Sequence, residues 1–365
     1  MRVAILTFAW SNNYGAALQA LALQRVLRTM NCEPFVVPLN PASCCSLVRR
    51  YIGRGFHNTI RKVRMQGVRK KFDIFRCRYF DYGGCRPMNY DELIAHPPKA
   101  DCYIVGSDQV WNTTVMRSDI ELQAYFLEFL SDSVPRLSYA ASFSVKTLDA
   151  NHSARIAADL KKFKAISTRE KSGVDIVGKM GLEAEWLPDP TLLMTGGEWR
   201  DVLQIERQDA AMVFHYELPW ETTVSCRKAA EKIAVALGCF VESPYPYDQP
   251  GLIPKGNPFC SPTEWFAHLS SARFVVTNSF HGTVFSLLTH RPFAVVLIKG
   301  RFSGMNERIL ALLERVGLSE RIVNSLDDAV KLCNQDIDWA MVDRFLESWR
   351  ESAIAFLKRN VKTVT

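Results

Sequence analysis

The sequence predicts an α/β protein with two similar halves, on three observations. Near the start, residues 3–8 form an apolar run, residues 12–15 a polar turn, residues 16–30 an amphipathic stretch and residues 35–39 a second apolar run. This order of strand, turn, helix and strand is typical of the start of a parallel sheet. The same alternation begins again after Gly196. Finally, polar segments follow most of the expected strands.

The first half continues the alternation after one basic interruption. We expect further strands over residues 101–105, 137–141, 165–167 and 185–187, and helices over residues 151–163 and 173–180. The turn at residues 12–15 lacks the G-x-G-x-x-G fingerprint of a dinucleotide-binding sheet.

Gly196 and Gly197 mark the expected boundary between the halves. After them we expect strands over residues 210–216, 239–242, 274–276 and 293–298, and helices over residues 221–237, 263–270, 305–316 and 325–332. A long helix over residues 338–358 closes the chain. The predicted domains are therefore residues 1–195, residues 196–337, and a C-terminal helix and tail over residues 338–365.

The polar segments fall where ligands bind in this fold class. Open α/β sheets bind ligands beyond the carboxyl ends of their strands. Six segments of this sequence follow expected strands: residues 12–15, 106–112, 168–172, 189–191, 215–216 and 278–283. Their shared placement favours an enzyme over a structural protein.

Residues 277–283, with the sequence TNSFHGT, are the most informative of these segments. An apolar strand turns there into an apolar helix, and the N–H groups and dipole at a helix start attract an anion. We expect Ser279, Gly282 and Thr283 to bind that anion, and His281 to act beside it as a general acid or base. The alternative is a helix cap with a histidine that packs in the core.

Two charged residues follow strands of the first half. The planar guanidinium of Arg169 suits a carboxylate or a phosphate. The alternative is an ion pair within the run Arg169, Glu170 and Lys171. Asp108 is either a catalytic base or the cap of a following helix.

Other segments contain side chains that suit a sugar or an anion. Ser107, Gln109 and Asn112 offer hydroxyl and amide groups to sugar hydroxyls, and Trp111 offers an aromatic face unless it belongs to the core. In the second half, His215, Lys299 and Arg301 are expected near the anion. The alternative for Lys299 and Arg301 is a solvated loop.

The sequence lacks the common hydrolase, metal and nucleotide motifs. It contains no G-x-S-x-G, H-E-x-x-H or P-loop pattern, and none of its ten cysteines forms a C-x-x-C pair. We therefore expect no metal, no cofactor and reduced thiols. The first ten residues are too short for a signal peptide, and no run of about 18 apolar residues occurs, so a cytoplasmic protein is expected.

The net charge of +7 is concentrated in one segment. Residues 49–78 contain eleven Lys or Arg and a single acid, Asp73, and Ile60, Val63, Val68, Phe72 and Phe75 suggest one apolar side of a helix. Nucleic acid is a poor partner because no aromatic-interleaved binding motif accompanies the charge. Peripheral contact with an anionic membrane and a solvated helix both remain open.

Five of these motifs together resemble the polysaccharide pyruvyl transferase family. They are NNYGAALQALAL (12–23), GSDQVWN (106–112), STREKSG (167–173), DPTLL (189–193) and TNSFHGT (277–283). The resemblance covers about residues 1–300. It implies a GT-B-like fold, with two Rossmann-like domains whose parallel sheets face a central cleft and a C-terminal helix that crosses back.

The resemblance also implies a reaction. Members move pyruvate from phosphoenolpyruvate onto two sugar hydroxyls as a cyclic ketal and release phosphate. His281, Arg169 and Asp108 are then the expected catalytic residues, and Asn12, Asn13, Tyr14 and Gly15 join residues 107–112 on the acceptor side. The acceptor is expected to be a polysaccharide precursor, in some pathways linked to a polyprenyl diphosphate at the cytoplasmic membrane face.

The sequence departs from the family pattern at one position. Better-studied members have Arg-Leu-His where this chain has Ser279, Phe280 and His281, and that arginine binds the donor. Lys299 or Arg301 is expected to replace it. Two other functions remain open: a GT-B glycosyltransferase that uses a sugar nucleotide, and a non-catalytic glycan-binding or regulatory protein with this fold.

Overall fold

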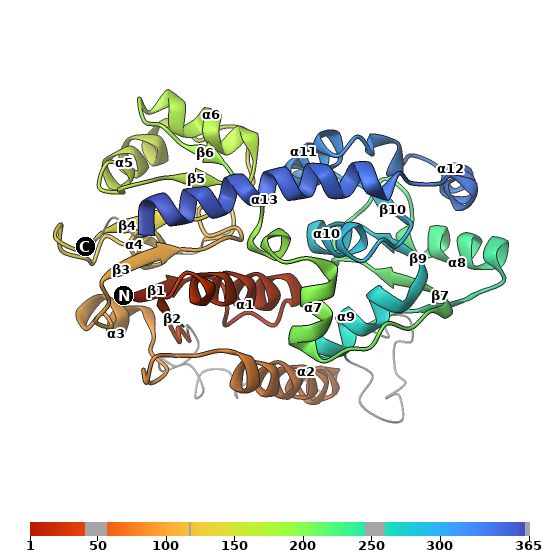
Figure 1. The fold of residues 1–365 in the computed structure, drawn as a ribbon, viewed down its shortest axis with the longest axis horizontal. Helices are drawn as coiled ribbons and strands as arrows, with labels where there is room; N and C mark the ends of the chain where they lie inside the picture. Colours follow the sequence, from red (N-terminus) through yellow and green to blue (C-terminus); the bar gives the residue numbers. More distant parts are fainter. Residues whose placement is uncertain (41–56, 117, 245–259, 362–365) are drawn as a thin grey trace. The chain divides into compact units, whose positions relative to one another are not determined.

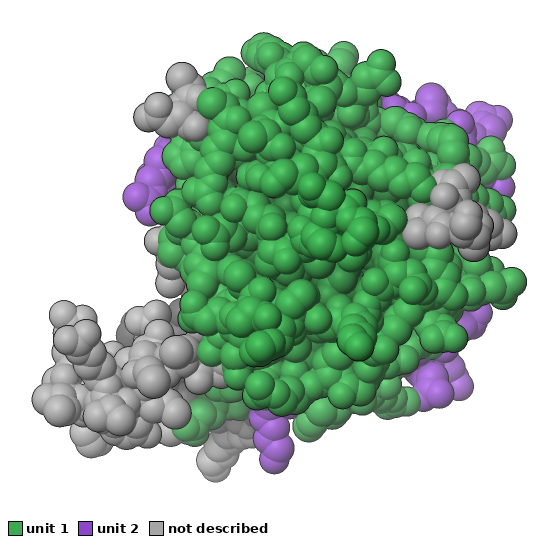
Figure 2. Space-filling view, turned by 90° about the vertical axis from the view of Figure 1, so that its left-hand side faces the viewer, with its two compact units in different colours: residues 1–69, 73–193, 349–365 green, residues 70–72, 194–348 purple. Residues whose placement is uncertain are grey.

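The computed structural model describes residues 1–40, 57–116, 118–244 and 260–361 (Figure 1). The chain divides into two compact units, coloured in Figure 2 and described separately here. Unit 1 comprises residues 1–69, 73–193 and 349–365, and unit 2 comprises residues 70–72 and 194–348.

Unit 1 is built on a parallel sheet of four strands in the order β2-β1-β3-β4. The strands are β1 (Arg2–Leu6), β2 (Glu33–Val36), β3 (Cys102–Val105) and β4 (Arg136–Ser138). A second parallel pair, β5 (Ser167–Thr168) and β6 (Glu185–Trp186), continues from β4 through a bridge between Ala141 and Thr168. Strands β3 and β4 are wholly buried, as expected of a parallel sheet with helices on both faces.

The helices of unit 1 follow its strands in the expected alternation. They are α1 (Tyr14–Thr29), α2 (His57–Tyr79), α3 (Tyr90–Ala95), α4 (Asp119–Tyr125), α5 (Ala150–Leu160), α6 (Lys171–Lys179) and the 3-10 helix η2 (Pro190–Leu193). The sequence analysis did not predict the short helices α3 and α4. Asn89 begins α3 with a capping box, in which its side chain accepts from the Glu92 N–H.

Helix α2 carries the described part of the basic segment. Val68, Phe72 and Phe75 are buried, which confirms the apolar side expected over these three residues, while Arg69 and Lys70 are exposed. The side chains of Ile60 and Val63, which were expected on the same side, lie outside the described ones. Residues 49–56 of that segment lie outside the described residues.

Unit 2 is built on a parallel sheet of five strands in the order β11-β10-β9-β7-β8. The strands are β7 (Ala210–Tyr216), β8 (Phe240–Glu242), β9 (Ala272–Thr277), β10 (Phe293–Val296) and β11 (Ile322–Val323). The chain leaves β7 toward β8 on one side and reaches β9 on the other. In such a doubly wound sheet this reversal is the point where ligands bind, at the carboxyl ends of β7 and β9. In unit 1 the corresponding point lies between β1 and β3.

The helices of unit 2 are α7 (Gly196–Leu203), α8 (Cys226–Leu237), α9 (Pro262–Ser271), α10 (Phe280–Leu288), α11 (Glu307–Arg315) and α12 (Leu326–Lys331), with 3-10 helices η3 (Gly300–Asn306), η4 (Ser319–Arg321) and η5 (Leu332–Asn334). Gly196 begins α7, with Thr195 as its cap, where a glycine boundary was expected. A Cβ at Gly196 would lie 2.0 Å from the Leu288 carbonyl oxygen, so glycine permits close packing there. Helix α8 begins at Cys226, five residues later than expected, because Ser225 caps it.

Helix α13 (Trp339–Val361) contributes to both units, since residues 339–348 belong to unit 2 and residues 349–361 to unit 1. Within unit 1, the Trp349 indole donates to the Trp186 carbonyl oxygen at 3.2 Å, and Arg350 Nε donates to the Leu192 carbonyl oxygen at 2.9 Å. Among the described residues, no helix is both long enough and apolar enough to cross a bilayer. The eight cysteines in the described ranges form no disulfide with one another.

Candidate functional site

The turn from β9 into α10 is held by side-chain hydrogen bonds. Thr277 Oγ1 donates to the Tyr216 carbonyl oxygen at 2.6 Å and accepts from the Ser279 N–H at 3.0 Å. Ser279 caps α10, because its Oγ accepts from the Gly282 N–H at 3.4 Å. The Thr283 N–H bonds to the Ser279 carbonyl oxygen at 3.0 Å. The two N–H groups expected to bind an anion are thus engaged by Ser279, the Gly282 group at a distance typical of a weak bond.

His281 lies in the first turn of α10 and is 7% exposed. Its ring packs edge-on against Phe280, with 5.2 Å between ring centroids. The guanidinium of Arg308, on α11, lies 5.5 Å from the Phe280 ring centroid on the same motif. Arg308 is also buried, so it places a positive charge close to this turn. The sequence analysis missed Arg308 because only the packing of α11 against α10 reveals it.

Gly282 is required by the tightness of the turn. A Cβ at this position would lie 2.5 Å from Thr277 Oγ1, closer than van der Waals contact allows. Glycine therefore lets the start of α10 approach the end of β9, as the sequence analysis expected of a close backbone approach.

The loop after β7 lies against the same turn. Asn278 Oδ1 accepts from the Leu218 N–H at 2.6 Å, and its Nδ2 donates to the Leu218 carbonyl oxygen at 3.0 Å. His215, near the end of β7, is 3% exposed, and its Nε2 lies 3.4 Å from Glu217 Oε2. Asn278 therefore fixes the loop that carries Glu217 beside the turn that carries His281.

Lys299 and Arg301 have other contacts in the structure. Lys299 Nζ lies 2.7 Å from Glu221 Oε1, and both side chains are largely exposed. The Arg301 guanidinium stacks 4.4 Å from the Phe302 ring centroid. These contacts are those of the solvated loop that was the alternative for both residues.

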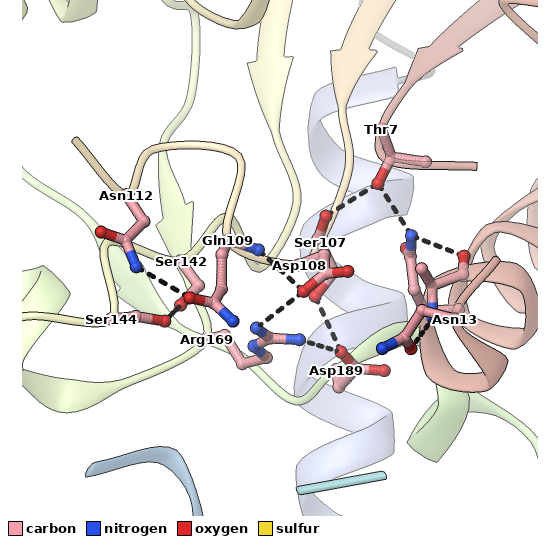
Figure 3. Close-up of polar contacts among 12 residues, drawn as sticks. Thr7, Asn13, Ser107, Asp108, Gln109, Asn112, Ser142, Ser144, Arg169 and Asp189 are labelled. Atoms are coloured by element: carbon pink, nitrogen blue, oxygen red, sulfur yellow. Dashed lines mark hydrogen bonds and ion pairs between the residues drawn. The ribbon is translucent and has the colours of Figure 1, made fainter. Parts of the chain in front are cut away.

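In unit 1, polar side chains from the ends of several strands converge on Arg169 (Figure 3). Arg169 NH1 donates to Asp189 Oδ2 at 2.8 Å, and its NH2 lies 3.6 Å from Asp108 Oδ1. Asp189 Oδ2 also accepts from Ser107 Oγ at 2.8 Å. Arg169 and Asp189 are 2% and 1% exposed, so this is a buried charge cluster at the carboxyl ends of β3 and β5.

The residues beside Arg169 are ordered by backbone contacts. Glu170 accepts from the N–H groups of Phe143 and Ser144 at 2.8 and 3.0 Å, so it holds the loop after β4. Asp108 has a φ of 76°, and its Oδ1 accepts from the Gln109 N–H at 2.9 Å. Asp108 does not cap a helix, because α4 begins eleven residues later with Ser118 at its N-cap position.

The structure corrects two residues of the expected acceptor side. Trp111 is 0% exposed, stacks on Phe126, and donates its indole N–H to the Tyr125 carbonyl oxygen at 3.0 Å. It belongs to the core, so its face is closed to a sugar ring. Tyr14 is the first residue of α1 and is also 0% exposed, where a polar turn was expected.

The remaining acceptor-side residues mostly order loops. Asn13 caps α1 by accepting from the Ala16 N–H at 3.1 Å, and Gly15 lies buried in the first turn of that helix. Asn112 Nδ2 donates to Gln109 Oε1 at 2.7 Å. Asn12 Oδ1 accepts from Arg76 at 2.9 Å.

Beside Asn12 lies a cavity of ≈ 410 Å³, which sequence reasoning did not find. Trp10, Asn12, Asn40, Asp73 and Tyr82 are among its lining residues. Trp10 is 40% exposed, and its indole donates to the Tyr125 hydroxyl at 3.1 Å, which fixes the ring. Burial raises the pKa of Tyr82 to about 12, so its hydroxyl keeps its proton at neutral pH. An aromatic face with polar groups around it is the usual composition of a small-molecule pocket.

Arg76 holds this cavity wall in place. Its Nε donates to the Ala9 carbonyl oxygen at 2.9 Å, and its NH2 donates to the Trp10 and Ser11 carbonyl oxygens at 2.9 and 2.7 Å. A basic residue of α2 thus orders the loop after β1, although the sequence analysis expected it on a surface.

A sequence model of one protein family, described as polysaccharide pyruvyl transferase, matches residues 13–299. The chain belongs to the polysaccharide pyruvyl transferase family. The matched region of this family member includes Asp108, Arg169, His215 and His281, and it ends before Arg301. A search of curated proteins finds no match.

Several solved structures align over most of the length of this pyruvyl transferase family member. A putative UDP-N-acetylglucosamine 2-epimerase from Listeria monocytogenes aligns with a TM-score of 0.51 and 9% identity, over 97% of this chain and 90% of that one. A UDP-GlcNAc 2-epimerase from Neisseria meningitidis bound to UDP-GlcNAc aligns with a TM-score of 0.48 and 10% identity, over 100% and 99%. The spinosyn forosaminyltransferase SpnP aligns with a TM-score of 0.49 and 15% identity, over 100% and 99%. The fold is α/β and GT-B-like, as the sequence predicted.

Proposed function

We propose that this transferase moves pyruvate from phosphoenolpyruvate onto two hydroxyls of a sugar as a cyclic ketal. Both sugar oxygens form bonds to C2 of the donor, the bond from C2 to the phosphate oxygen breaks, and phosphate leaves. One hydroxyl proton ends on the donor methylene, which becomes a methyl group, and the other leaves with phosphate. The reaction needs no oxidant or reductant, so no redox cofactor is required.

The observation that carries this proposal is the position of His281. It lies in the first turn of α10, after the carboxyl end of β9 and beside the point where the strand order of unit 2 reverses, and within the region matched by the family. An imidazole there is suited to transfer a proton between a sugar hydroxyl and the donor methylene. The weak Gly282 to Ser279 bond can be exchanged for a bond to a phosphate oxygen.

In this proposal, arginine side chains supply the positive charge that binds the anionic donor. In unit 1, the bond to Asp189 holds Arg169 in place, and we propose that its guanidinium binds the carboxylate of the donor. In unit 2, Arg308 contacts Phe280 of the His281 motif, whereas the contacts given above for Lys299 and Arg301 are with Glu221 and Phe302. We therefore assign to Arg308 the charge that the sequence analysis sought in Lys299 or Arg301.

The acceptor sugar is proposed to bind in the ≈ 410 Å³ cavity of unit 1, with its ring against Trp10 and its hydroxyls near Asn12 and Asp73. This replaces the expected contact with Trp111. We further propose that the acceptor is carried on a polyprenyl diphosphate, and that exposed basic residues of α2 contact the membrane that holds it.

The test is phosphate release from phosphoenolpyruvate, measured with polyprenyl-diphosphate-linked sugars and with free oligosaccharides as acceptors. We expect acceptor-dependent release by the wild type and a loss of about 10²–10⁴-fold in His281→Ala, the usual contribution of a general acid or base. The matched control is His290→Ala, because His290 is an exposed histidine that pairs with Asp343.

Three results would count against the proposal. Full turnover by His281→Ala would remove the histidine from the mechanism. Glycan binding without any phosphate release would indicate a non-catalytic member of the family. Thermal stabilisation by UDP- or GDP-sugars, with none by phosphoenolpyruvate, would indicate a glycosyltransferase.

A further inference from the structure

Three side chains with different donor atoms meet in unit 2, at the end of β7 and the start of α8. The ligand atoms of His215, Glu217 and Cys226 all lie within 4.8 Å of one another. We propose that these residues bind one divalent transition-metal ion, with Zn²⁺ as the best fit. The site is independent of the proposed function, because it rests on these residues alone.

The fold brings the three residues together through strand alternation. Val213 and His215 lie on one face of β7, because side chains two apart along a strand share a face, and Glu217 continues this spacing one residue beyond the end of the strand. Val213 and Cys226 belong to one buried cluster with Ala229 and Ile233 of α8, so this face is the one that α8 covers. The rings of Phe214 and Tyr216, on the opposite face, pack against Trp265.

His215 is the observation that points to a ligand. It is 3% exposed, and among the described residues neither of its ring nitrogens has a hydrogen-bond partner. Buried polar side chains in proteins nearly always have such a partner, so an exception needs an explanation. Nε2 lies 3.4 Å from Glu217 Oε2, and an ion between these two atoms would supply a partner to both.

The donor set favours zinc over a hard cation. Imidazole nitrogen, carboxylate oxygen and thiolate sulfur are the three ligand types of protein zinc sites, whereas Mg²⁺ and Ca²⁺ select oxygen ligands. Ligands about 2.0–2.3 Å from a tetrahedral ion lie about 3.3–3.7 Å from one another, a spacing that the histidine and glutamate already have. Cys226 is the first residue of α8 and is 1% exposed, and its Sγ lies within 4.8 Å of the ligand atoms of the other two residues.

Three protein ligands leave one position of a tetrahedral ion open. Asn278 ties Leu218, the neighbour of Glu217, to the turn that precedes His281. A bound ion would therefore lie near that turn, with one position free to accept water or an anionic oxygen. No spacing motif joins residues 215, 217 and 226, so the sequence analysis expected no metal.

The experiment is a zinc titration of the whole chain, without a histidine tag, after treatment with a chelator. Zinc retained per chain is measured after desalting, and affinity is measured against a competing chelator. We expect one tightly held zinc, with affinity at least tenfold weaker in His215→Ala, Cys226→Ser and the milder Glu217→Gln. Cys77→Ser and His290→Ala are the matched controls, since both residues are exposed and lie outside the cluster.

Cobalt replacement and thermal unfolding keep the test decisive if one variant folds poorly. Co²⁺ should give a thiolate-to-cobalt charge-transfer band in the wild type and in Cys77→Ser, but not in Cys226→Ser. Zinc should raise the melting temperature of the wild type and of both controls more than that of Glu217→Gln. Less than one zinc per chain in the wild type, or one zinc of equal affinity in all three cluster variants, would overturn the proposal.

Discussion

Arg169 is a charged residue with almost no contact with solvent. Its guanidinium is balanced by Asp189 at 2.8 Å and by Asp108 at 3.6 Å, and Asp189 is stabilised in turn by Ser107 and by the N–H and hydroxyl of Thr191. Burying these charges is costly, and removing one partner from such a cluster costs far more than a surface ion pair would. This arrangement keeps the guanidinium in one position, which is a requirement for binding an anionic substrate.

The buried carboxyl of Asp159, in unit 1, makes the stability of this protein depend on pH. Burial, and secondly the charge of Glu128, raise the pKa of Asp159 to about 6, while its unfolded value is about 3.9. Between these values the folded state binds more protons than the unfolded state, so the free energy of unfolding falls as pH rises from about 4 to 6.

Asp159→Asn should remove this penalty. We expect the variant to match the wild type near pH 4 and to be more stable by about 1–2 kcal/mol above pH 7, because one pKa unit corresponds to about 1.4 kcal/mol. Urea unfolding at pH 4, 6 and 7.5 measures the difference. Asp175→Asn, at an exposed position of α6, is the control. A constant difference at all three pH values would rule out titration of Asp159 as the cause.

Residue types alone predicted which polar residues follow strands better than they predicted the contacts of those residues. Arg169, Asp108 and His281 lie at strand ends, as the sequence indicated. Trp111 has the composition of a sugar-binding residue, but Phe126 and Tyr125 enclose it in the core. Their packing on Trp111 depends on α4, a seven-residue helix that the sequence analysis did not predict, so the error could not be seen from sequence.

At the scale of elements, buried strands were the most predictable features. The range Ala210–Tyr216 was predicted for β7 and is found, because its apolar run ends in a clear change of composition. The start of α8 was misplaced because the predicted helix was extended through residues 221–225, three of which, Thr222, Thr223 and Val224, are poor helix formers. Thr222 bridges to Ile298, and Ser225 caps the helix at Cys226. Local propensity and tertiary pairing therefore agree on the later start.

The close approach of α10 to the end of β9 at Gly282 can be tested by substitution. Gly282→Ala places a methyl group 2.5 Å from Thr277 Oγ1, so we expect the free energy of unfolding to fall by about 1–3 kcal/mol. Gly178→Ala, in α6, is the matched change, since among the described residues nothing lies within 4 Å of its Cβ. It should stabilise by about 0.5–1 kcal/mol through helix propensity. Equal effects of the two changes, measured by urea unfolding, would contradict the close contact.

At the scale of the whole molecule, composition gives a formal net charge of +7 at pH 7. Part of the basic segment is structural, since Arg76 is buried and orders the loop after β1. Arg69, Lys70 and Arg78 remain exposed on α2, with Ile74 exposed between them. These residues are the described part of the proposed membrane contact.

We expect the protein to float with vesicles rich in anionic lipid at low salt and to separate from them at high salt. Each basic residue near such a surface contributes about 1 kcal/mol, so Lys70→Glu with Arg78→Glu should weaken flotation markedly. Lys161→Glu with Lys179→Glu makes the same change of charge at exposed sites on another part of unit 1. Equal flotation by the two double variants would assign any binding to net charge alone.

The order of strand and helix patterns along the chain predicted the fold class well, because these patterns repeat in both halves and the family motifs occur in the expected order. The cavity beside Trp10 and the cluster at His215 were not predictable, since each joins residues from segments that no local pattern connects. Both depend on tertiary packing, of Arg76 against residues 9–12 and of α8 against β7.

The division of α13 has a consequence for how the protein is made. Unit 1 contains residues 349–365 as well as residues 1–69 and 73–193, so its last segment leaves the ribosome only after residues 194–348 have been made. Trp349 and Arg350, which bond to the backbone at Trp186 and Leu192, are absent until then. A nascent chain of this protein therefore carries an incomplete unit 1 while it makes unit 2, and unit 1 can be completed only after unit 2 has left the ribosome.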